Sequence, residues 1–302
     1  MPSSPGCRVC PDRIRLSSPA GISSTMARAL DVSSCRFTLN NGVGMPALGL
    51  GTYKLVGEAA YGPVRAALEC GYRHVDTASF YKNEEAVGRA VRDSGVPRKE
   101  VFITSKVWNT EQGYEATMKA FQRTLSRLGT DHLDLYLVHW PVTGKRLDTY
   151  RALERLYDEG LVRAIGVSNF TERHLEELLS ACQVVPAVNQ VEMSPFLYQK
   201  DLLLHCQEKG VLVTAYSSFA RGKVLGDRTL REVGRRHGKS PAQVILRWCL
   251  QRGMAVIPRS SNPERIRENA QVFDFSLDPE EMMVLDLLHS GLRTTTDPQI
   301  YD

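Results

Sequence analysis

Short apolar segments that alternate with segments of helical pattern occupy most of this 302-residue chain. Each apolar segment is too short for a buried helix and has the length of a buried strand. The expected strands cover residues 47–51, 73–77, 101–107, 133–139, 164–168, 187–191, 211–216 and 255–258. Eight strands separated by helices favour a closed parallel (β/α)8 barrel, with a doubly wound open sheet as the alternative fold.

Helical periodicity and helix-start signals fill the segments between these strands. Helices are expected over residues 59–70, 84–94, 113–128, 147–159, 172–180, 200–209, 227–236, 241–251, 263–271 and 279–289. Ser240, Asn262 and Asp278 each precede a proline, which is the pattern of a capping residue before the first helical position. Upstream, the turn Asn40-Asn41-Gly42 within residues 37–45 predicts a β-hairpin that closes the bottom of the barrel.

Residues 1–30 differ in composition from the rest of the chain and are expected to form a disordered extension, with the barrel domain over residues 31–302. The segment is rich in Ser, Pro and Arg and has one acid, Asp12. A transit peptide and a translation start at Met26 are the alternatives. Cys7 and Cys10 have a metal-site or redox spacing, but no second pair or nearby histidine completes a zinc site, so two thiols in a tail are favoured.

Charge and cysteine content narrow the possible partners and the compartment. The net charge is +4, and most of it comes from four arginines in the first 30 residues, which leaves the rest nearly neutral. The near neutrality of residues 31–302 argues against nucleic acid as the main partner. No apolar run approaches the roughly 18 residues that would indicate a membrane-spanning helix. The seven cysteines have no repeating spacing, which is typical of a reducing compartment, so we expect a cytoplasmic protein.

Polar residues follow three of the expected strands at the point where each one ends. Asp76, Lys106 and His139 lie at these ends, and Tyr81 comes shortly after the first of them. The carboxyl ends of barrel strands form one mouth, where active sites are built. An acid, a phenol, an ammonium and an imidazole in that mouth suit proton transfer to or from a carbonyl or alcohol. Singly, each has a structural alternative, such as a buried Asp76–Lys106 pair or a core histidine.

Three motifs in order resemble the signatures of one family, the aldo-keto reductases. Gly71-Tyr72-Arg73-His74-Val75-Asp76-Thr77-Ala78, followed by Tyr81-Lys82-Asn83-Glu84, is similar to the first signature. Residues 133–141 resemble the second and residues 257–269 the third, and the resemblance covers about residues 36–300. Short segments after Pro141 and Tyr216 make the chain more similar to the compact diketogluconate reductases and protozoan-type prostaglandin F synthases. This similarity implies a monomer with an open substrate mouth.

The resemblance implies NADPH-dependent reduction of aldehydes and ketones to alcohols. Hydride would come from the nicotinamide, and Tyr81 would protonate the developing alkoxide as general acid. We expect the Lys106 ammonium, held by Asp76, to lower the pKa of Tyr81 from its ordinary value of about 10. His139 would orient the carbonyl oxygen by a hydrogen bond.

The family positions also imply a binding site for NADPH or NADP+. Ser168, Asn169 and Gln190 would hold the nicotinamide carboxamide, and Tyr216 would stack on the ring. Two guanidiniums and a hydroxyl suit a 2′-phosphate dianion and predict a preference for NADPH over NADH. These three groups belong to Arg259, Arg265 and Ser260. The other expected cofactor contacts are Thr52, Asp76, Ser217, Phe219, Arg221, Glu268 and Asn269.

Two departures from the family pattern affect the expected cofactor site. Arg259 stands where lysine is usual, and its flat guanidinium can also stack on adenine and so tolerate NADH. Residues 217–222 replace a Ser-Pro-Leu-Gly loop that wraps the pyrophosphate. Loss of the proline and glycine changes the backbone freedom of this loop and predicts altered cofactor binding, although Arg221 adds a possible phosphate contact.

Aromatic residues at the family's substrate positions suit hydrophobic carbonyl compounds. They are Tyr53, Phe80, Trp108 and Trp140, with His139 as the polar member. Two other functions are alternatives: an NADPH-binding regulatory or scaffolding barrel with weak or no turnover, and an isomerase or lyase whose substrate phosphate occupies the arginine cluster. The four polar residues at the strand ends favour the reductase, because a pure binding protein has no need of proton-transfer groups.

Overall fold

The computed structural model describes residues 16–17 and 32–302, so the Cys7–Cys10 pair and most of the expected extension lie outside the described residues. Eight parallel strands form one sheet in the order β11-β10-β9-β8-β7-β6-β5-β4. These strands are β4 (Leu50–Gly51), β5 (His74–Asp76), β6 (Phe102–Val107), β7 (Leu135–Val138), β8 (Ile165–Ser168), β9 (Val188–Glu192), β10 (Leu212–Tyr216) and β11 (Ala255–Val256). Their order follows the chain, as the alternation of segments predicted.

The first and last strands meet, which closes the sheet into a barrel. Leu48 and Val256 form a parallel bridge. The Gly49 amide donates to the Val256 carbonyl at 2.8 Å, and the Gly51 amide donates to the Pro258 carbonyl at 3.2 Å. This closure rules out the doubly wound open sheet. The last strand is shorter than expected because Pro258 has no N–H to continue the ladder.

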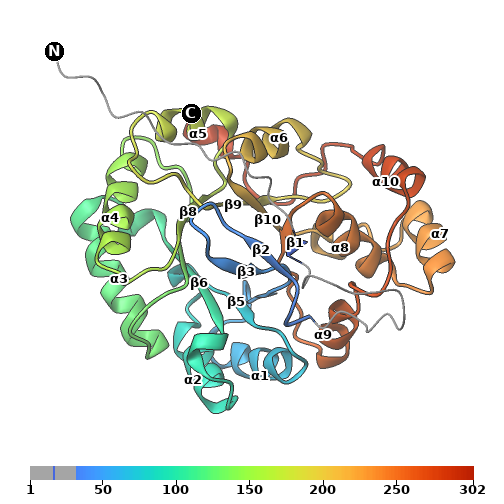
Figure 1. Cartoon of the computed structure of the whole chain (residues 1–302), viewed down its shortest axis with the longest axis horizontal. Coiled ribbons are helices and arrows are strands. Elements are labelled where there is room, and N and C mark those ends of the chain that lie inside the picture. The colour runs from blue at the N-terminus through green and yellow to red at the C-terminus, as the bar shows by residue number, and fades with distance from the viewer. Residues whose placement is uncertain (1–15, 18–31) are drawn as a thin grey trace.

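Helices surround the strands, as Figure 1 shows. They are α1 (Tyr61–Glu69), α2 (Glu84–Asp93), α3 (Tyr114–Leu128), α4 (Arg146–Asp158), α5 (Glu172–Leu179), α6 (Lys200–Glu208), α7 (Arg228–His237), α8 (Pro241–Gln251), α9 (Pro263–Ala270) and α10 (Pro279–Asp286). The predicted caps form, because Ser240 and Asp278 make capping boxes and Asn262 accepts from two amides. No helix within the described residues has the length and apolar character needed to cross a membrane.

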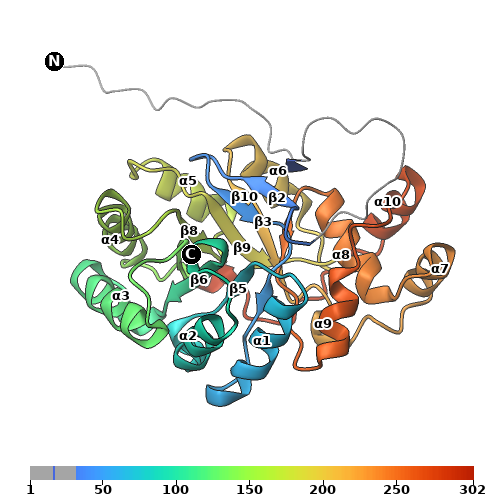
Figure 2. The same ribbon diagram turned by 60° about the horizontal axis from the view of Figure 1, so that its bottom comes forward.

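A β-hairpin covers the amino-terminal end of the barrel, as the turn sequence predicted. Its strands β2 (Arg36–Thr38) and β3 (Gly44–Pro46) pair antiparallel, and the short β1 (Leu16–Ser17) pairs with β2. The Asn40 amide donates to the Pro186 carbonyl at 3.1 Å, and the Asn41 amide donates to the Arg163 carbonyl at 2.9 Å. Both carbonyls lie just before barrel strands. Figure 2 shows the hairpin at this end, so the opposite end is free to hold a site.

The helix layer packs closely enough to exclude side chains at some positions. Gly88 on α2 is one of them, since a Cβ built there would lie 2.0 Å from the Leu128 carbonyl oxygen at the end of α3. This glycine therefore allows α2 and the end of α3 to approach each other closely. The strands that carry the candidate site are buried on both faces, which is typical of parallel sheets covered by helices.

Candidate active site

Asp76, Lys106, His139 and Tyr81 lie at the carboxyl end of the barrel, as the sequence predicted. Asp76 is the last residue of β5, Lys106 is in β6, and His139 directly follows β7. Neighbouring parallel strands end at the same edge, so these residues come together. Tyr81 reaches them from η2 (Ser79–Tyr81), a turn of 3₁₀ helix that follows β5.

Lys106 connects the other members of this group. Its Nζ donates to Asp76 Oδ1 at 2.6 Å, to the Thr77 carbonyl at 2.9 Å and to the Tyr81 hydroxyl at 3.3 Å. These contacts use all three hydrogens of the ammonium. The Lys106 side chain is fully buried and Asp76 is 2% exposed. A buried charge of this kind is stable only when it is paired and hydrogen-bonded, and that requirement fixes the position of the ammonium beneath the Tyr81 phenol.

The pKa of Tyr81 differs from the sequence-based expectation. Burial raises this pKa well above its ordinary value, and the Asp76 carboxylate acts in the same direction. The predicted lowering by Lys106 was wrong, because burial of the phenol has the largest effect on its pKa and the Asp76 carboxylate, which is paired with Lys106, adds to it. Tyr81 therefore carries its proton near neutrality, which is the state that a proton donor requires.

His139 supplies a neutral imidazole to the mouth. Burial lowers its pKa well below the ordinary value, and the nearby Lys106 ammonium adds to this effect. Its ring centroid lies 5.7 Å from that of Tyr81, and its Nδ1 is buried without a hydrogen-bond partner. A neutral imidazole has one N–H to donate, so His139 can donate a hydrogen bond to an oxygen without placing a second cation beside Lys106.

The turn that carries Tyr81 is held by residues whose role the sequence analysis missed. The Ser79 hydroxyl lies 2.7 Å from Glu111 Oε2 and 3.2 Å from the Lys106 carbonyl. On the other side, Asn83 Nδ2 donates to the Thr52 carbonyl at 3.0 Å, and Asn83 Oδ1 accepts from Thr77 Oγ1 at 2.7 Å. Asn83 and Thr77 belong to the first signature, so their polarity within a buried motif was the available signal.

The residues expected at the nicotinamide bond to one another and to the catalytic group. The Gln190 amide donates to Asp76 Oδ2 at 2.7 Å, and Ser168 Oγ donates to the Gln190 carbonyl at 2.8 Å. The Asn169 amide donates to the His139 carbonyl at 3.0 Å, and the Tyr216 hydroxyl donates to Asn169 Oδ1 at 2.7 Å. Hydrogen bonds therefore link these four side chains to the Asp76 carboxylate and to the His139 carbonyl.

Thr52, which directly follows β4, supports this arrangement. Its hydroxyl and its amide both donate to the Asp76 carbonyl, at 2.9 and 3.0 Å. The side chain is fully buried. The Thr52 hydroxyl is therefore bonded to the backbone of Asp76, and its contact with a cofactor stays a prediction.

The expected phosphate site lies at the start of α9. Arg259 and Arg265 are exposed, and among the described residues no ion pair involves either of them. The Asn262 side chain accepts from the Glu264 and Arg265 amides, at 2.7 and 3.4 Å. This cap occupies backbone amides that would otherwise be available to an anion at the start of α9. The guanidiniums of Arg259 and Arg265 are therefore better placed than these amides to bind a phosphate.

The other third-signature residues occupy different environments. The Ser260 hydroxyl bonds the amide and carbonyl of Asn262, at 3.1 and 3.2 Å, and so is already engaged within the turn. Asn269 is buried and Glu268 is partly buried on α9. Ser260 and Asn269 therefore shape this turn and helix, while the arginines face outward.

The loop after β10 adopts an unusual backbone conformation. Ser217, Ala220 and Arg221 all have positive φ, at 51°, 45° and 58°. Residues other than glycine and asparagine rarely occupy this left-handed region, and each costs on the order of 1 kcal/mol or more. Arg221 is exposed while Phe219 packs against the core. The departure from the family pattern therefore leaves a guanidinium on the outer side of this loop.

Three of the four predicted substrate aromatics surround Tyr81 and His139. Phe80 stacks on Trp108 with a centroid distance of 3.8 Å and an interplanar angle of 17°. Trp108 also lies 5.0 Å from His139, and Tyr53 lies 5.2 Å from Tyr81. Trp140 instead lies beside Tyr301, at 5.9 Å. The mouth is thus walled by aromatic rings on one side, which suits apolar or planar carbonyl compounds.

A model of the aldo/keto reductase family matches residues 42–289. The glyoxal reductase of Bacillus subtilis (strain 168) is 51% identical over 261 residues, which is 86% of this chain and 95% of that protein. The 9,11-endoperoxide prostaglandin H2 reductase of Trypanosoma cruzi (strain CL Brener) is 48% identical over 265 residues, covering 86% and 94%.

Solved structures agree with this relationship. The crystal structure of a Bombyx mori aldo-keto reductase in complex with NADP superimposes with a TM-score of 0.82 and 34% identity, covering 86% of this chain and 94% of that one. The fold, the sequence motifs and the polar residues at the strand ends thus all indicate the same family. The chain belongs to the aldo/keto reductase family, whose members are oxidoreductases that use NADP(H) to reduce carbonyl groups.

Proposed function

We propose that Tyr81 is the proton donor of an NADPH-dependent carbonyl reductase and that His139 orients the substrate oxygen. The observation that carries this proposal is the contact of the Tyr81 hydroxyl with the buried Lys106, which is itself paired with Asp76. Bound NADPH supplies the hydride. The chain then has two tasks at the substrate oxygen, which are to hold it by a hydrogen bond and to deliver one proton to it.

Proton delivery is assigned to Tyr81 because its hydroxyl contacts Lys106 beside His139, and its raised pKa keeps it protonated. The neutral His139 donates the orienting hydrogen bond without competing for that proton. The aromatic wall of Phe80, Trp108 and Tyr53 holds the carbon side of the substrate. Similarity to a glyoxal reductase supports small reactive aldehydes, including dicarbonyls, as the first substrates to test.

A turnover assay tests the function directly. The full chain is mixed with NADPH and a panel that contains glyoxal, methylglyoxal, benzaldehyde derivatives and cyclic ketones, and NADPH absorbance is followed. The proposal expects consumption with at least one aldehyde. NADPH binding without any turnover across the panel would favour the regulatory or scaffolding barrel instead, and turnover that needs no NADPH would favour an isomerase or lyase.

The arginine pair is proposed to select NADPH by its 2′-phosphate. Arg265→Gln is expected to raise the KM for NADPH by roughly 10- to 100-fold, the value of a charge-assisted hydrogen bond to phosphate, with little change in the KM for NADH. The exposed Arg228→Gln on α7 is the matched control. Equal effects of Arg265→Gln on both cofactors would contradict the assignment and would place this guanidinium on the adenine or pyrophosphate.

We also propose that the protein acts as a monomer in the cytoplasm. All four members of the group around Lys106 come from one chain, so no second copy is needed to complete the site. Sedimentation equilibrium is expected to give a mass near the 33.7 kDa of one chain. A mass twice that value, stable on dilution, would contradict the monomer.

A further inference from the structure

A buried carboxylate at the end of β9 holds the segment that follows α10. Glu192 is 2% exposed and accepts hydrogen bonds from both the amide and the hydroxyl of Thr294 and of Thr295. The two amides lie 2.8 and 3.0 Å from its oxygens, and Thr295 Oγ1 lies at 2.6 Å. One carboxylate thus accepts four hydrogens, so both of its oxygens are satisfied inside the protein.

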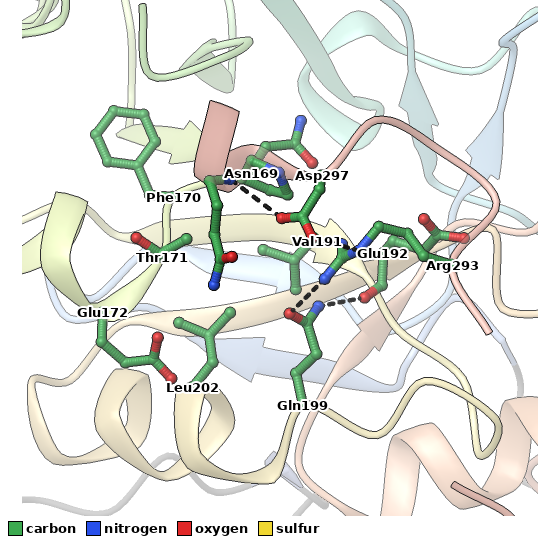
Figure 3. A pocket seen from close by; sticks show the side chains of 12 residues that line it. Asn169, Phe170, Thr171, Glu172, Val191, Glu192, Gln199, Leu202, Arg293 and Asp297 are labelled. Carbon is green, nitrogen blue, oxygen red and sulfur yellow. Dashed lines mark hydrogen bonds and ion pairs between the residues drawn. The ribbon is translucent and has the colours of Figure 1, made fainter. Parts of the chain in front are cut away.

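A second set of contacts holds the same segment beside Glu192. The Gln199 amide donates to the Glu192 carbonyl at 2.7 Å, and Arg293 donates to Gln199 Oε1 at 3.3 Å. Figure 3 shows these side chains around a small cavity of about 70 Å³ that also borders Asn169. The segment is therefore held against the end of β9 and next to the residues expected at the nicotinamide.

On the cofactor side, a chain of hydrogen bonds runs from Glu192 to His139. Thr295 Oγ1 lies 3.1 Å from the Tyr216 hydroxyl, which lies 2.7 Å from Asn169 Oδ1. The Asn169 amide in turn donates to the His139 carbonyl. Because a carboxylate only accepts, it takes the single hydrogen of the Thr295 hydroxyl. Thr295 can then only accept from Tyr216, so the single Tyr216 hydrogen is shared between Asn169 Oδ1 and the more distant Thr295 Oγ1.

On the substrate side, the segment ends beside the aromatic wall. Tyr301, in η6 (Pro298–Tyr301), accepts a hydrogen bond from the Asn109 amide at 3.0 Å, and its ring lies 5.9 Å from Trp140. Its carbonyl accepts from Arg146 at 3.0 Å. Asn109 directly follows Trp108, so Tyr301 contacts one predicted substrate residue, Trp140, and the neighbour of another. No sequence motif indicated this placement.

We infer that Glu192 is a positioning residue that joins the 293–301 segment to both halves of the site. Through Thr295 it orients Tyr216 at the nicotinamide, and through the rest of the segment it holds Tyr301 at the substrate mouth. The inference rests on the proposed reductase function for its turnover readouts. Two further readouts, amide exchange and NADPH titration, do not depend on turnover and so distinguish its failure from a failure of that function.

The experiment compares Glu192→Gln with the wild-type full chain. An amide side chain presents hydrogens where Thr294 and Thr295 already donate, so their amides are expected to exchange at least about tenfold faster. The dissociation constant of NADPH, measured by fluorescence, is expected to rise roughly three- to tenfold, which is the range for losing one hydrogen bond. The KM for a bulky aromatic aldehyde should rise more than the KM for glyoxal, with kcat changed much less than either. Glu208→Gln, an exposed charge-matched change on α6, is the control.

Two further variants separate the branches and remain informative if Glu192→Gln does not fold. Thr295→Val removes only the hydroxyl link to Tyr216, so it should weaken NADPH binding and leave the substrate size preference unchanged. Tyr301→Leu should leave NADPH binding unchanged and should alter the substrate size preference. A folded Glu192→Gln protein with wild-type amide exchange, NADPH affinity and KM values would overturn the inference. So would a Thr295→Val protein with unchanged NADPH affinity together with a Tyr301→Leu protein with unchanged KM values.

Discussion

Tyr81→Phe is expected to lower kcat for carbonyl reduction by roughly 10²- to 10⁴-fold, which is the usual contribution of a general acid. The change removes one oxygen whose hydrogen-bond partner in the protein is Lys106, at 3.3 Å. Lys106 keeps its shorter bonds to Asp76 and to the Thr77 carbonyl, so the fold and the NADPH site should persist. The measurement is stopped-flow NADPH oxidation, with NADPH affinity determined separately by fluorescence.

The pH dependence of the wild-type enzyme follows from the same two groups. Tyr81 donates only when protonated, and burial raises its pKa, so its contribution is lost only as the pH rises past the ordinary tyrosine value of about 10. Burial lowers the pKa of His139, so this imidazole becomes charged only well below the ordinary value of about 6.5. We therefore expect kcat/KM for reduction to be flat between about pH 7 and 9.

A matched control separates loss of the proton donor from loss of any phenol. Tyr157→Phe removes the hydroxyl of a partly buried tyrosine near the end of α4, which is not one of the proposed site residues, and should leave kcat unchanged. Wild-type turnover in Tyr81→Phe would assign the proton to another group. In that case the pH profile should show a pKa between 7 and 9 that this variant does not move.

The fold was predictable from local pattern because each of its elements has a local cause. Apolar runs of strand length gave the barrel strands, and the caps at Ser240, Asn262 and Asp278 gave the starts of three helices. The predicted end of the last helix was less accurate. α10 ends at Asp286, whose carboxylate accepts from Trp248 and Arg252 of another element, and local helical pattern contains no information about such a partner.

The identities of the candidate site residues were predictable from the sequence, but the direction of the Tyr81 pKa shift was not. The motifs located Asp76, Lys106 and His139 because strand ends meet by topology. The direction of the Tyr81 pKa was wrong because a sequence shows neighbouring charges but not the extent of burial, which here outweighs Lys106. Glu192 and Thr294 are 102 residues apart in the chain, so their contact exists only after folding. The one available signal was the alternation of Gln190 and Glu192 as polar residues on a buried strand.

A double-mutant cycle at Asp76 and Lys106 is expected to separate stability from catalysis. Lys106→Met leaves the 2%-exposed Asp76 carboxylate without its ammonium, and Asp76→Asn leaves the buried ammonium without its anion. Breaking a buried pair in this way typically costs roughly 3–5 kcal/mol of unfolding free energy, because one uncompensated charge remains. The double variant has no such charge, so we expect it to be more stable than either single variant. Urea unfolding of the four proteins measures these differences.

Catalysis should behave differently in the same four proteins. Lys106 and Asp76 act on one phenol, and without the ammonium the Tyr81 hydroxyl loses its 3.3 Å partner. Turnover is therefore expected to stay at least about 10²-fold below wild type in the double variant even where stability recovers. Recovery of both properties would mean that the pair is only structural, whereas additive stability losses would mean that water enters and compensates each lone charge. Recovered stability without recovered turnover assigns the pair a role at the proton donor that a neutral core cannot replace.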